Sequence, residues 1–120
     1  MHNKNRSAKL YIEDVLKYIE KIELFTNNFT YEDFLQDDKT CYAVIRCIEV
    51  IGEASKNIPE NIKSQYSFIP WNDIIGMRNK IVHGYFDTDY EVVWATIKID
   101  IPKLKPLIEQ ILKDYKTYNN

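Results

Sequence analysis

The sequence predicts an all-α fold, an antiparallel bundle of four to five helices. The chain has only three glycines and four prolines, while 45% of its residues are hydrophobic. This composition favours long regular elements over the tight turns of a β fold. In several stretches, apolar residues recur at steps of three and four, the spacing of one helix face. The 120 residues contain no Gly/Ser-rich spacer, so residues 1–120 are expected to form one domain, ordered from about 8 to 115.

The first helix is expected to begin after Ser7 and to end near residues 26–28. The Ser7 hydroxyl can accept a hydrogen bond from an N–H group of the first turn. A brief turn that Thr30 and Asp33 could close as a capping box should follow. The apolar stripe of this first helix contains Ala8, Ile12, Val15, Ile19 and Ile22.

A second long helix, from about residue 39 to residue 57, is apolar over more than half its circumference and should lie centrally. Gly52 interrupts it at a cost of about 1 kcal/mol relative to alanine, so a neighbouring element is expected to approach closely there. Arg46, Glu49 and Glu53 could form a polar stripe along one side. We expect Glu49 to be solvated or paired on the surface.

A single turn is expected over residues 60–66, followed by a third helix over residues 71–82. Pro70 would occupy the first turn of this helix, where its missing N–H group costs nothing. Gly84 is well placed to terminate the helix in the left-handed conformation.

The last helix is expected to be capped by Asp87 or Thr88 and to be interrupted partway. Pro102 and Pro106 each remove a backbone donor and collide with the preceding turn. The sequence therefore predicts a kink or a short break between residues 99 and 105.

Composition and charge exclude several classes of protein. A net charge of -2 disfavours a protein that coats nucleic acid through a large basic face. Cys41 and Cys47 match neither a redox motif nor a zinc-ligand pair, so two reduced core thiols are expected. The polar N-terminus supports neither a signal peptide nor a membrane span, and a cytoplasmic protein is expected.

Arg78, His83 and Tyr85 are the residues that look chemically purposeful. A histidine near its normal pKa can exchange a proton with RNA oxygens, and a guanidinium can stabilise charge on phosphate. In an ideal helix Arg78 and His83 would lie about 140° apart, a poor geometry for joint action. A helix end at Gly84, or a second copy in a symmetric dimer, could bring the groups together. Alternatively, His83 is only a favourable charge at a helix C-terminus.

Residues 78–85 read R-N-x-x-x-H-x-Y, and this run resembles the signature of the HEPN superfamily. The resemblance is greatest to HepT toxins, which are paired with MNT nucleotidyltransferase antitoxins. It covers most of the chain, from residue 8 to about residue 113. Other segments that resemble this family in order and spacing are residues 46–54, 70–71, 89–94 and 101–104.

The resemblance implies a helical HEPN bundle that dimerises and forms a composite, metal-independent ribonuclease site at the subunit interface, without a cofactor. It implies that Arg78 and His83 are the catalytic pair and that Asn79 supports the site. It also implies that the antitoxin transfers AMP to Tyr85 and so silences the toxin. Glu53 is a weaker candidate for a supporting contact in the same cleft.

Two alternatives to a toxin ribonuclease remain open. The chain could be a non-catalytic helical binding partner of a nucleotidyltransferase, with Arg78 and His83 contacting nucleotide. It could also be a helical interaction protein whose motif is structural. Tyr85 would then be a packing residue, and Lys80 a solvated charge or one that steers phosphate.

Overall fold

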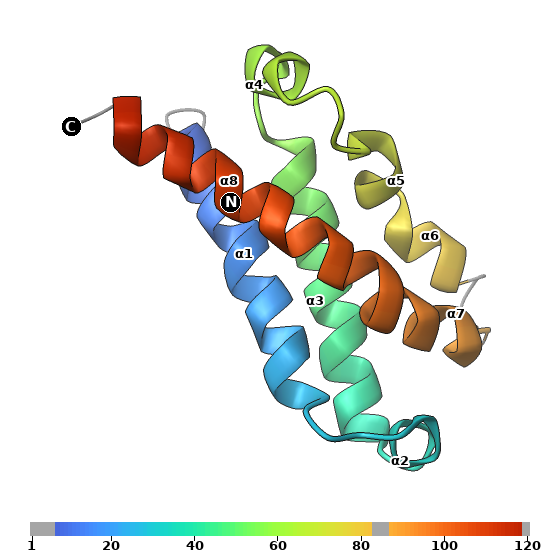
Figure 1. The fold of residues 1–120 in the computed structure, drawn as a ribbon. Coiled ribbons are helices and arrows are strands. Elements are labelled where there is room, and N and C mark those ends of the chain that lie inside the picture. The colour runs from blue at the N-terminus through green and yellow to red at the C-terminus, as the bar shows by residue number, and fades with distance from the viewer. Residues whose placement is uncertain (1–6, 83–86, 119–120) are drawn as a thin grey trace.

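The computed structural model describes residues 7–82 and 87–118, and these form an antiparallel helical bundle (Figure 1). Helices α1 and α3 pack side by side, and α8 crosses back over α1 (Figure 1). The fold class predicted from the sequence is therefore confirmed. The main elements are α1 (Ala8–Phe25), α3 (Asp38–Lys56), α5 (Trp71–Ile75), α6 (Met77–Ile81), α7 (Tyr90–Ala95) and α8 (Ile101–Tyr118).

The helix starts in the first half of the chain follow local capping rules. The Ser7 side chain accepts a hydrogen bond from the Leu10 N–H group, which begins α1. Thr30 and Asp33 form the predicted capping box before α2 (Tyr31–Leu35), with hydrogen bonds of 3.0 and 3.1 Å. The Asp37 carboxylate accepts from the N–H group of Thr40, so α3 begins one residue earlier than expected.

The core of the described chain is one cluster of buried apolar side chains contributed by both the long and the short helices. Cys41 and Cys47 lie in it as free thiols, as predicted. Burial raises the pKa of both thiols, which suppresses the reactive thiolate form. The short helix α4 (Glu60–Gln65) adds Ile62, and Tyr66 just beyond it is also buried.

Helices α3 and α5 approach each other closely at Gly52. A Cβ atom at this position would lie 3.2 Å from the Ile75 carbonyl oxygen and 3.6 Å from that of Ile74. Both neighbours are backbone atoms, so a side chain could be fitted only by shifting one helix away from the other. The close neighbour predicted from this glycine is confirmed.

The expected single helix over residues 71–82 is wrong in two respects. It is interrupted at Gly76, where the chain changes from α5 to α6 and Asn79 donates to the Gly76 carbonyl three residues earlier. Pro70, in turn, lies just before the first turn of α5 and not within it.

The C-terminus of α6 comes before the expected stop at Gly84. Val82 is already extended, with φ -119° and ψ 110°, and it pairs with Thr88 in an antiparallel bridge. The backbone N–H group of Asp89 donates to the Ile81 carbonyl at 2.8 Å. Pairing with the residues just before α7 therefore accompanies the end of α6, and the predicted left-handed conformation of Gly84 lies outside the described residues.

The last helix is capped by Asp89, in place of Asp87 or Thr88, since its carboxylate accepts from the Val92 N–H group. A π-helical turn, η1 (Thr96–Asp100), then joins α7 to α8. Its last bond, from the Ile101 N–H group, spans five residues. The sequence predicts a kink or a break near Pro102, and the structure has a widened helical turn there. The wider turn makes room for the Pro102 ring, which in a regular α-helix would clash with a carbonyl group of the preceding turn. Pro106 lies inside α8.

Replacing Gly52 by alanine should lower the free energy of unfolding by up to about 2 kcal/mol. Overpacking against the Ile75 carbonyl costs about 1–3 kcal/mol, which outweighs the ~1 kcal/mol gained from alanine's helix propensity. Urea denaturation measures the difference, with Glu53→Ala, an exposed change on the same turn, as the control. A more stable Gly52→Ala protein would show that α5 is free to move away.

Candidate functional site

Arg78 lies on α6 with its guanidinium directed to α3. Its Nε atom donates to the Glu49 Oε2 atom at 3.1 Å. The Arg78 side chain is 48% exposed and that of Glu49 is 32% exposed, so the pair lies at the surface, where solvent and ligands reach it. The guanidinium of Arg78, which is expected to act on phosphate, is therefore accessible to solvent and bound through its Nε atom to Glu49.

The position of this pair follows from the contact at Gly52. Helix α3 and the α5–α6 segment run in opposite directions (Figure 1). Three residues back along α3 from Gly52 is Glu49, and three residues forward from Ile75 is Arg78. Because both steps lead away from the close contact in the same direction, the two side chains meet one turn beyond it.

The ion pair itself contributes little to stability. Exposed pairs are typically worth about 0–1 kcal/mol, because water screens the charges and both side chains lose freedom. Its geometric effect is larger. A guanidinium has five N–H donors, and the one on Nε is taken by Glu49. The two terminal amino groups are the ones that can bind a phosphate in the two-pronged manner typical of arginine.

His83, Gly84 and Tyr85 lie outside the described residues. Val82, directly before them, pairs with Thr88 in an antiparallel bridge. Helix α6 ends at Ile81, before His83 is reached. The roles of His83 and Tyr85 stay predictions.

Asn79 and Glu53, the predicted supporting residues, lie on the two helices that carry Arg78 and Glu49. Asn79 and Lys80 follow Arg78 on α6 and are exposed. Glu53 is exposed one turn after Glu49 on α3, and the backbone carbonyl of Glu53 accepts from the Asn57 side chain. Their supporting roles are untested predictions. The sequence predicts Glu49 as a solvated or paired surface charge, and its surface ion pair with Arg78 confirms this. The identity of the partner depends on the antiparallel register of α3 and α6, which the sequence pattern of α3 does not contain.

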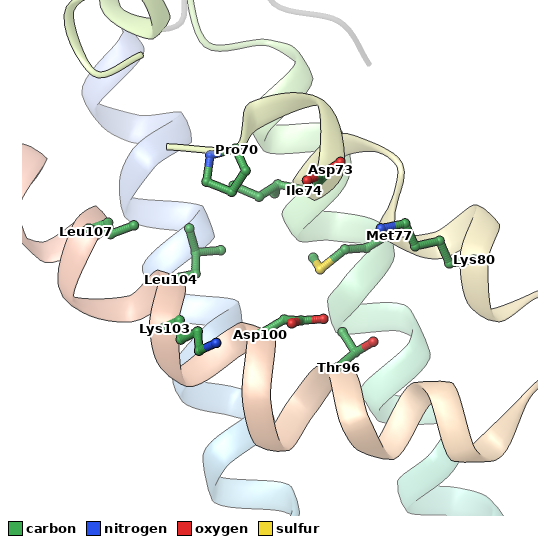
Figure 2. Close-up of a pocket in the computed structure, with 10 residues that line it drawn as sticks. All are labelled: Pro70, Asp73, Ile74, Met77, Lys80, Thr96, Asp100, Lys103, Leu104 and Leu107. Atoms are coloured by element: carbon green, nitrogen blue, oxygen red, sulfur yellow. The ribbon is translucent and has the colours of Figure 1, made fainter. Parts of the chain in front are cut away.

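A separate pocket of about 330 Å³ lies on another face of α6, between α5–α6 and η1–α8 (Figure 2). Apolar side chains form most of its lining, and two carboxylates and two lysines lie in its wall as well. Neither Arg78 nor Glu49 borders it. The charged residues are Asp73, Lys80, Asp100 and Lys103.

No three histidine, cysteine or carboxylate side chains come close enough to hold a metal ion within residues 7–82 and 87–118. In the same part of the chain, no helix combines the length and the apolar character needed to cross a bilayer.

Comparison with known proteins gives consistent matches. Residues 15–111 match the protein family described as Ribonuclease HepT-like. A "Probable ribonuclease HepT" of Thermococcus cleftensis is 51% identical over 108 residues, covering 90% of this chain and 98% of the relative. Two proteins of Methanocaldococcus jannaschii, both named "Putative RNase", are each 46% identical to this chain over 109 residues. These matches cover 91% of this chain and 90% and 94% of theirs. No solved structure matches significantly.

Proposed function

The chain belongs to the HepT-like ribonuclease family of the HEPN superfamily, and we propose that it is the toxin of a toxin–antitoxin pair, a metal-independent endoribonuclease. The observation that carries the proposal is the exposed guanidinium of Arg78, oriented by Glu49 at the end of a helix. RNA is the substrate, and a nucleotidyltransferase antitoxin is the partner.

In the proposed reaction, His83 accepts the proton of an RNA 2′-hydroxyl, and the 2′ oxygen attacks the adjacent phosphorus. The bond from phosphorus to the 5′ oxygen breaks, and that oxygen receives a proton. Negative charge builds on the phosphate as the new bond forms, and the terminal amino groups of Arg78 stabilise it. The positive charge that a metal would supply comes from the Arg78 guanidinium, with Asn79 and Glu53 as supporting contacts.

The proposed active form is a homodimer with a composite site. The reaction needs a group that accepts a proton and another that donates one, and each chain offers one histidine in this motif. A two-fold axis places the same surface of both subunits face to face. Two copies of Arg78 and His83 at one cleft would then supply both proton transfers.

The proposed control point is Tyr85, two residues after His83. Transfer of AMP to its hydroxyl by the antitoxin adds a negative phosphate and a bulky nucleotide where RNA must bind. The added charge repels the RNA backbone and the bulk blocks the cleft, so modification silences the enzyme.

Purified protein should cleave single-stranded RNA in the presence of EDTA, and His83→Ala or Arg78→Ala should reduce the rate by at least about a hundredfold. Gel analysis of a labelled RNA measures the rate, and circular dichroism checks the fold of each variant. Lys9→Ala, an exposed change on α1, serves as the control. Full activity of His83→Ala would overturn the assignment.

Mixing the two inactive variants should restore part of the activity if the site is composite. In a heterodimer of Arg78→Ala with His83→Ala, the shared cleft keeps one arginine from one subunit and one histidine from the other. The second proton transfer is then left to water, so the recovery should be partial. Unfolding and refolding the variants together, followed by the same RNA assay, measures the recovery. No recovery in a demonstrated heterodimer would place both groups of each site within one subunit.

Coexpression with the partner nucleotidyltransferase should yield protein that is heavier by whole AMP units and inactive on RNA. Tyr85→Phe should abolish the added mass and remain active, because phenylalanine keeps the ring and lacks the accepting hydroxyl. Intact-mass spectrometry reads the modification, and Tyr90→Phe is the matched control. Persistent AMP on Tyr85→Phe would place the modification elsewhere.

A further inference from the structure

Glu49 is the acidic residue that contacts the proposed catalytic arginine, and nothing in the motif assigns it a role. It lies on α3, twenty-nine residues before Arg78, and reaches it across the helix interface. We infer that Glu49 is a positioning residue, which holds the Arg78 guanidinium by Nε so that its terminal amino groups face the scissile phosphate. This inference rests on the proposed function of Arg78.

The geometry distinguishes positioning from simple charge pairing. The contact is made through Nε at 3.1 Å, the donor nearest the side-chain stem. A carboxylate placed across the two terminal amino groups would occupy the donors that bind phosphate in a forked arrangement. A carboxylate at Nε leaves one edge of the guanidinium for substrate and fixes the plane of the group.

The backbone supports this role, because both residues sit on helices beside the close contact at Gly52. Gly52 is buried on the turn of α3 that follows Glu49. Ile75 ends α5 three residues before Arg78 and meets Gly52 through its carbonyl oxygen. The close approach of the two backbones at Gly52 therefore places the carboxylate within reach of the guanidinium.

Removal of Glu49 should affect the kinetics differently if it positions Arg78 than if it only adds negative charge near the RNA. Removing a carboxylate next to an RNA site lowers the local negative charge and should leave KM unchanged or lower it. Loss of orientation should instead lower kcat, since a small misplacement of a catalytic group can cost up to about a hundredfold. A fall in kcat without a rise in KM is therefore the signature of the role.

The test compares Glu49→Ala with Glu49→Gln in steady-state RNA cleavage. Glu49→Ala should lose about tenfold to a hundredfold in kcat. Glu49→Gln should lose less, because its amide oxygen can still accept from Nε. Glu13→Gln removes one negative charge from an exposed position on α1 and should leave kcat unchanged. An unchanged or higher kcat in Glu49→Ala would overturn the inference.

A second readout does not require activity. The chain has three arginines, so the Nε–H signals in a nitrogen-15 NMR spectrum are readily assigned with Arg78→Lys. The Arg78 signal should exchange with water more slowly than that of the exposed Arg46 and should lose this protection in Glu49→Ala. Lack of protection in the unmodified protein would refute positioning. Protection in a protein that cleaves no RNA would instead refute the proposed function.

Discussion

The missing side chain at Gly52 is the constraint on which the candidate site depends. It allows the backbone of α5 to approach α3 until a Cβ atom there would lie 3.2 Å from a carbonyl oxygen. Once the two elements touch at this point, their antiparallel course brings Glu49 opposite Arg78. A weak surface ion pair could not set this geometry, because its free energy of about 0–1 kcal/mol is too small. The helix contact sets it, and the ion pair orients a side chain that is already in place.

The parts of the fold that follow from local rules could be predicted from the sequence. Ser7 and the pair Thr30 and Asp33 cap their helices as expected, because each interaction spans only three residues. The parts set by distant residues could not. Helix α6 ends at Ile81 because the N–H group of Asp89 binds its carbonyl, and no pattern near Ile81 contains that information.

The candidate site divides in the same way. The motif predicts Arg78 as a site residue, and the structure places it in an exposed position with its Nε atom bound to Glu49. The sequence predicts Glu49 as a solvated or paired surface charge but does not name its partner, because Glu49 and Glu53 look alike in a helical pattern and only the register of two helices separates them. The roles of His83 and Tyr85 stay predictions from the family motif.

A structure of the protein with an uncleavable RNA, carrying a 2′-deoxy sugar at the scissile position, tests the central claim most directly. A phosphate oxygen should lie within hydrogen-bond distance of the terminal amino groups of Arg78, with Nε still bound to Glu49. An RNA strand bound elsewhere on the bundle, with Arg78 facing away from every phosphate, would contradict this role of Arg78.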